Sequence, residues 1–212
     1  MDRETCWQVI EQQRRAIADL LADLTPQQWE TPSLCAGWRI RDVAAHIAIT
    51  PDPPSPAVML GAGLRARGNY NRFIHDLTIR HANRPASELV TQIRTNAASR
   101  RLPKLTNYRN ILFDTVVHGQ DIAIPLGRSI AVPPTAAAAA ADRAVQVGWP
   151  VWDRHRLDGI HLSANDIDWE YGNGSEIRGP ITALLLLITG RAATLDQVTG
   201  DGIDRLIRQL SR

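Results

Sequence analysis

Residues 29–46 read Trp-Glu-Thr-Pro-Ser-Leu-Cys-Ala-Gly-Trp-Arg-Ile-Arg-Asp-Val-Ala-Ala-His, a loop followed by the start of a helix. Residues 31–38 combine proline, glycine and small polar side chains, which is typical of a loop. From about Trp38 to Thr50 apolar residues recur at helical spacing, so we predict a helix that carries His46 among apolar neighbours. This helix should end at a run of prolines, which lack the amide that a helix needs: Pro51, Pro53, Pro54 and Pro56.

The same periodicity predicts further helices on both sides of this stretch. On the N-terminal side it predicts one helix, over residues 4–23. On the C-terminal side it predicts three helices. The first covers residues 57–82, the second runs from 85–87 to about 100 and is ended by Leu102-Pro103, and the third runs from Asn107 to about 124. Residues 1–128 are therefore expected to form a helical bundle.

The composition changes at residues 125–134, which are rich in proline and glycine and predict a linker. Beyond it we expect an alanine-rich helix capped by Thr135, then three short strands over 160–164, 167–171 and 175–178 with tight turns between them. Two helices complete the prediction, one from Pro180 to Gly190 and one over about 202–210. The fold class is mainly α, and residues 129–212 are expected to form a small α+β domain.

Composition and charge exclude several classes of function. The formal net charge is +2 and the arginines are dispersed, which argues against nucleic-acid binding. No apolar stretch reaches the length of a membrane span, and the N-terminus is polar, so we expect a cytoplasmic protein without membrane association. The two cysteines, Cys6 and Cys35, are too few for a disulfide framework and are expected to be reduced.

Three residues are candidates for a metal site. Asp114 and His118 are four residues apart, which places both on one face of the predicted helix. His46 lies on another helix, and helical bundles often build metal sites from facing helices. Two histidines and one carboxylate leave coordination positions open and suit catalytic zinc or non-haem iron(II). Asp121 follows three residues after His118 and is either a second-sphere partner that orients a ligand histidine or a surface charge.

Residues 29–46 resemble the opening motif of the mycothiol-dependent maleylpyruvate isomerase family. Residues 114–123, Asp-Thr-Val-Val-His-Gly-Gln-Asp-Ile-Ala, are similar to its second metal motif, and residues 178–191 are similar to its C-terminal domain. The resemblance implies a DinB-like four-helix bundle that binds zinc through His46, Asp114 and His118. In this family the middle ligand is usually glutamate, so Asp114 is a departure that puts the strength of metal binding in doubt.

The resemblance also implies a function. The expected activity is that of a metal-dependent isomerase or S-transferase that uses mycothiol as a thiol cosubstrate and acts on a small electrophile. Arg67, Arg72 and Arg109 are candidates for holding acidic groups of the substrate. The alternative is a non-catalytic metal-binding or sensing protein on the same bundle. DinB-like bundles often form homodimers, although nothing in this sequence requires one.

Overall fold

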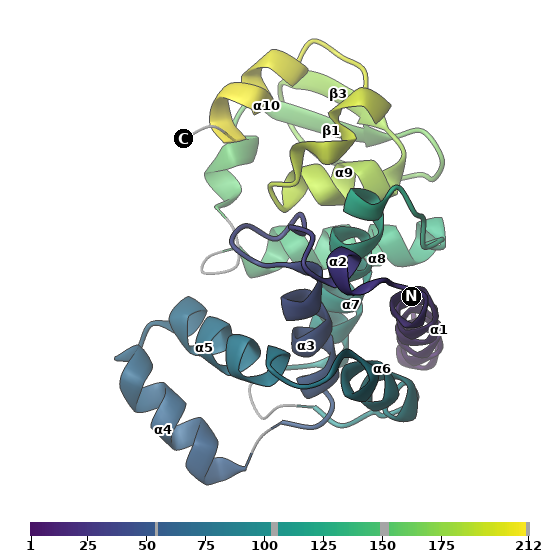
Figure 1. Cartoon of the computed structure of the whole chain (residues 1–212). Coiled ribbons are helices and arrows are strands. Elements are labelled where there is room, and N and C mark those ends of the chain that lie inside the picture. Colours follow the sequence, from purple (N-terminus) through teal and green to yellow (C-terminus); the bar gives the residue numbers. More distant parts are fainter. Residues whose placement is uncertain (54, 103–105, 149–152, 211–212) are drawn as a thin grey trace. The chain divides into compact units, whose positions relative to one another are not determined.

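The computed structural model of the chain describes residues 1–53, 55–102, 106–148 and 153–210 (Figure 1). Pro54 and Pro103, two of the prolines predicted to end helices, lie outside these residues. The contacts divide the chain into two compact units, residues 2–130 and residues 131–212 with Met1. The predicted domain boundary at residues 128/129 lies close to this division, and the autonomy of the two domains stays a prediction.

Four helices of the first unit pack around one core. They are α1 (Arg3–Ala22), α3 (Ile40–Ile49), α6 (Ala86–Thr95) and α7 (Tyr108–Ala123). Both α3 and α1 contact α6 and α7, so the four helices form a closed ring of contacts, as a four-helix bundle does. Each helix buries an apolar stripe in this core, and α3 contributes three fully buried alanines that allow close approach: Ala44, Ala45 and Ala48.

Local signals fix where several of these elements begin. The Asn107 side chain accepts hydrogen bonds from the backbone N–H groups of Arg109 and Asn110, so it caps α7 as predicted. Thr25 and Gln28 form a capping box around the single-turn helix α2 (Pro26–Trp29). This short turn carries Trp29 into the core, just before the loop that leads to α3.

The predicted helix over residues 57–82 is wrong as a single element. It is two helices, α4 (Pro56–Ala66) and α5 (Tyr70–Ala82), and α5 packs on α3. Arg67 and Gly68 both adopt positive φ, at 50° and 79°, which ends α4, and the Asn69 side chain caps α5. The apolar periodicity continues on both sides of this break, which is why it concealed the turn.

In the second unit, α8 (Pro134–Val147) packs on α9 (Ile181–Ile188). A single 3-10 turn, η1 (Ile124–Leu126), follows α7 in the first unit, at the start of the predicted linker. Thr135 does not cap α8, because the helix already starts at Pro134, whose ring suits the first helical position.

A three-stranded sheet completes this unit. Its strands are β1 (Ile160–Ala164), β2 (Glu170–Gly172) and β3 (Ser175–Gly179), in the order β2-β1-β3. β1 pairs antiparallel with β2 but parallel with β3, so the turn after β2 does not form a hairpin. Gly174 makes this return possible, because a Cβ there would lie 2.2 Å from the Gly159 carbonyl oxygen.

The remaining elements surround the sheet. They are the 3-10 helices η2 (Arg154–Leu157) and η3 (Ala192–Gln197) and the helix α10 (Ile203–Leu210), which packs on both. Among the helices of the described residues, none is long and apolar enough to cross a membrane. Cys6 and Cys35 form no disulfide among the described residues, and Cys6 is buried.

Candidate metal centre

Two neighbouring helices of the bundle bring the three predicted ligands together. His46 comes from α3, and Asp114 and His118 come from successive turns of α7. His46 Nε2 lies 3.2 Å from Asp114 Oδ1, and His118 Nε2 lies 3.4 Å from the same oxygen. One donor atom from each residue lies within 4.8 Å of the other two. Residues 68 positions apart in the chain therefore converge on one point.

Two of the three separations between the donor atoms match the edge of a tetrahedral zinc site. Zinc–ligand bonds of about 2.0–2.1 Å place neighbouring ligand atoms about 3.3–3.4 Å apart in a tetrahedron. The two nitrogen–oxygen separations, 3.2 and 3.4 Å, are close to this edge length. The Asp114 side chain keeps 29% of its surface exposed, so solvent or a small ligand can reach the site. The donor set and its access thus suit a metal with an open coordination position.

Asp121, for which the sequence left two roles open, lies beside His118. Its carboxylate is fully buried and lies 2.8 Å from His118 Nδ1. A hydrogen bond at Nδ1 fixes the imidazole so that Nε2 faces Asp114 and stays available as a ligand. Asp121 is therefore a buried partner of the candidate ligand and not a surface charge.

The charges of the site are strongly coupled. Burial alone lowers the pKa of His118, but the carboxylates of Asp114 and Asp121 outweigh it and raise this pKa to about 10. Burial likewise raises the pKa of Asp114, whereas the positive charges of His46 and His118 hold this pKa well below its usual range. In the absence of a metal, the site therefore holds a proton between Asp114 and His118 at neutral pH.

His46 is held differently from His118. Its Nδ1 is buried and has no hydrogen-bond partner among the described residues. Its ring instead contacts the Trp38 indole, with the centroids 5.4 Å apart, and the His118 ring at 5.0 Å. Trp38 was part of the quoted motif, but sequence reasoning gave it no role.

Sequence reasoning also missed Arg14, which lies fully buried on α1. Its Nη1 donates to the backbone carbonyls of Asn96, Ala97 and Ser99, at 3.4, 3.3 and 3.0 Å. Burial lowers its pKa to about 10, although the Asp114 carboxylate opposes this shift. Arg14 thus places a positive charge within electrostatic range of the candidate site. The adjacent Arg15 is solvent-exposed, so no local pattern marks Arg14 as the buried one.

The three candidate arginines do not lie together. Arg67 and Arg72 line one surface cavity of about 600 Å³, together with Leu64, Arg65 and Asp76. Arg109 instead donates from Nε to the Tyr108 hydroxyl and lies over the Tyr108 ring. Arg67 and Arg72 therefore line one cavity, whereas Arg109 contacts Tyr108.

Comparison with known structures gives the fold. A crystal structure of the mycothiol-dependent maleylpyruvate isomerase matches with a TM-score of 0.64 and 12% sequence identity, over 95% of this chain and 93% of that chain. A structure of a mutant of this isomerase matches equally well. The chain is thus mainly helical and has the DinB-like fold of this isomerase.

Comparison of sequences finds one family that part of the chain resembles. No curated protein sequence gives a significant match to the chain. Residues 10–102, which include the loop before α3 and His46, match the family described as mycothiol maleylpyruvate isomerase N-terminal domain. Residues 10–102, somewhat less than half of the chain, are thus similar to this N-terminal domain family.

Proposed function

We propose that the chain is a metal-dependent enzyme of thiol chemistry, which binds one zinc ion through His46 Nε2, Asp114 Oδ1 and His118 Nε2. The convergence of these three donor atoms from α3 and α7 carries the proposal. When bound, zinc supplies a positive charge that favours the thiolate form of a thiol at the open position. The family match supports mycothiol as that thiol cosubstrate.

The residues of the site have separate roles in this proposal. His46, Asp114 and His118 act as ligands and not as acid–base groups, and Asp121 holds His118 in the orientation that ligation needs. In an isomerase the thiolate sulfur adds to one carbon of a cis double bond that is conjugated to a carbonyl, and the electron pair of the double bond moves onto the carbonyl oxygen as an enolate. The resulting single bond rotates, and the enolate re-forms the double bond as the C–S bond breaks and the thiolate leaves. In an S-transferase the C–S bond remains, and the enolate takes up a proton instead.

The cavity lined by Arg67 and Arg72 is the proposed anchor for acidic groups of the substrate or the thiol. Three arginines and one aspartate leave this cavity positively charged. Tyr70 lies between Arg67 and Arg72 in the sequence, and burial together with the charge of Asp114 raises its pKa. Tyr70, at the start of α5, is thus close enough to Asp114 to be affected by its charge.

Metal content and turnover of the purified protein test the proposal. We expect about one zinc per chain, lost in His118→Ala and kept in the matched control His75→Ala, because His75 is exposed on α5 and lies beside Asp76. The zinc-loaded protein should convert electrophiles from a test panel in the presence of mycothiol, and His118→Ala should not. Zinc without any turnover would favour a non-catalytic metal-binding protein. Wild type that takes up no zinc would remove the metal site and the proposed mechanism with it.

A further inference from the structure

The two histidines of the proposed metal site are oriented by different means. A ligand histidine usually donates its second ring N–H to a carboxylate, a carbonyl or water, which fixes the ring. His118 has this arrangement, with Nδ1 at 2.8 Å from the Asp121 carboxylate. His46 Nδ1 is buried and has no such partner in the described part of the chain. Apart from the contact of its Nε2 with Asp114 at 3.2 Å, His46 is therefore oriented by packing.

Trp38 is the aromatic residue that supplies this packing. Its ring centroid lies 5.4 Å from that of His46, with the planes tilted by 51°, and 6.1 Å from that of His118, with the planes nearly parallel at 23°. Contacts at these distances are typical of favourable aromatic pairs. Because the indole touches both imidazoles, it restricts their rotation at the same time.

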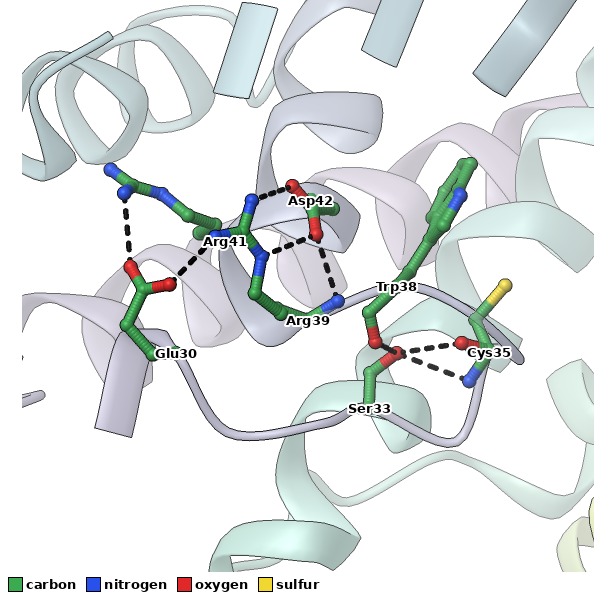
Figure 2. Close-up of polar contacts among 7 residues, drawn as sticks. All are labelled: Glu30, Ser33, Cys35, Trp38, Arg39, Arg41 and Asp42. Atoms are coloured by element: carbon green, nitrogen blue, oxygen red, sulfur yellow. Dashed lines mark hydrogen bonds and ion pairs between the residues drawn. The ribbon is translucent and has the colours of Figure 1, made fainter. Parts of the chain in front are cut away.

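The backbone that carries Trp38 is itself fixed. We call residues 31–39 the Trp38 loop. The Ser33 hydroxyl donates to the Trp38 carbonyl at 2.8 Å and accepts from the Cys35 N–H at 3.1 Å, and the Ser33 N–H donates to the same Trp38 carbonyl (Figure 2). The Trp38 N–H donates to the Cys35 carbonyl at 3.0 Å. The loop is therefore closed on itself around Trp38.

Both sides of the Trp38 loop are attached to the helices that carry the ligands. The buried Asp42 carboxylate accepts from the Arg39 backbone N–H and from Arg39 Nε and Nη2, each at 2.9 Å, which ties the loop to the first turn of α3 (Figure 2). Arg39 also contacts Glu30, which binds Arg41 as well. On the other side, the Leu34 N–H donates to the Asp121 carbonyl on α7 at 3.3 Å. The loop thus spans α3 and α7.

We propose that Trp38 is a positioning residue of the metal centre, which orients His46 through ring packing where a hydrogen bond at Nδ1 is lacking. The inference rests on the metal site proposed above and adds a residue that acts through a ligand. Removing the partner that orients a ligand typically lowers metal affinity about 10- to 100-fold. We therefore expect Trp38→Leu to weaken zinc binding to this extent and Trp38→Phe to restore most of the loss.

Zinc affinity and the spectrum of the cobalt-substituted protein test the role of Trp38. The dissociation constant of zinc is measured by competition with a chromophoric chelator for wild type, Trp38→Leu and Trp38→Phe. Trp169→Leu is the matched control, because Trp169 lies on the second unit and donates to Asp142. The visible absorption of bound Co²⁺ reports ligand geometry, and it should change in Trp38→Leu alone. Unchanged affinity and an unchanged cobalt spectrum in Trp38→Leu would overturn the inference.

A second readout needs no metal. In metal-free protein, the ring protons of His46 should show a shift caused by the indole ring current, assigned in the NMR spectrum by comparison with His46→Gln. This shift should disappear in Trp38→Leu and persist in reduced form in Trp38→Phe, while thermal unfolding shows that each variant is folded. If wild type binds no zinc, the proposed function is contradicted. If the same protein shows the ring-current shift, the orientation of His46 by Trp38 is still supported. A His46 signal that does not respond to Trp38→Leu would refute the inference by itself.

Discussion

At the scale of single residues, the candidate site is a compact set of opposed charges. Asp114 faces both imidazoles, and His118 lies between the carboxylates of Asp114 and Asp121. Such an arrangement binds a proton tightly when no metal is present, as the raised pKa of His118 indicates. A metal ion bound as proposed would take the place of this proton, so metal binding and protonation would compete for the same atom, His118 Nε2.

This competition predicts a pH dependence of stability. The pKa of His118 is about 10 in the folded protein and 6.5 for an ordinary histidine, so its contribution is complete below about pH 6.5 and is lost as the pH rises towards about 10. Metal-free wild type should therefore lose free energy of unfolding over this interval relative to His118→Gln. Urea denaturation of both proteins at several pH values measures the difference.

The variant Asp121→Asn provides the control for this pH dependence. It removes one of the two carboxylates that raise the His118 pKa, so the loss should be complete at a lower pH than in wild type. A constant difference in stability between wild type and His118→Gln from about pH 6.5 to about pH 10 would contradict the charge coupling.

At the scale of helices, the end of α6 depends on a residue from α1. The helix ends at Thr95, earlier than the expected residue 100, and the carbonyls of Asn96, Ala97 and Ser99 turn towards the Arg14 guanidinium. A cation at the C-terminal end of a helix satisfies carbonyls that have no partner within the helix. Arg14 thus joins α1 to α6 within the bundle.

Arg14 and its neighbour Arg15 form a natural pair for testing this contact. Arg14→Met leaves buried carbonyls without donors, so it should destabilise the protein by about 2–4 kcal/mol. Arg15→Met removes only an exposed pair with Glu11 and should cost no more than about 0.5 kcal/mol. Denaturant unfolding of the two variants measures both effects, and equal losses would show that Arg14 has no special role.

Helix periodicity and capping residues were sufficient to place most elements from the sequence, but not every boundary. Asn107 marked the start of α7, whereas the break at Arg67 and Gly68 was hidden within a continuous apolar pattern. The order of the strands in the sheet could not be predicted either, because local alternation of polar and apolar residues does not say which strand lies beside β1.

The candidate site was less predictable from the sequence than the fold. The spacing of Asp114 and His118 placed them on one face of α7, but their meeting with His46 depends on how α3 packs on α7. The frequent construction of metal sites from facing helices suggested that contact, and the family resemblance supported it. The burial of Arg14 and the place of Trp38 over the histidines depend on tertiary packing and had no sequence signal of their own.

At the scale of the whole molecule, the candidate site belongs to one of the two units. The ligands, Asp121 and the Trp38 loop all lie within residues 2–130, which have their own apolar core. Residues 131–212 have a separate helix-and-sheet arrangement. We propose on this basis that residues 1–130 fold and bind metal without the rest of the chain.

A fragment of residues 1–130 tests this proposal. It has about the size of a typical domain, so it should unfold cooperatively and bind zinc with the affinity of the full chain. The same fragment with His118→Ala should fold and bind no zinc. Circular dichroism during heating and chelator competition measure the two properties, and a fragment that is unfolded with and without zinc would show that the second unit is needed for the fold.

The Trp38 loop and His46 belong to one short, uninterrupted piece of chain. Seven residues lie between Trp38, two residues before α3, and His46, at the end of the second turn of α3. An α-helix turns by about 100° with each residue, so one residue inserted or deleted between them would move His46 to another face of α3. Substitutions in this segment can be compensated by repacking, but a change in its length cannot. The number of residues between Trp38 and His46 is thus as strict a requirement for this candidate site as the identity of its proposed ligands.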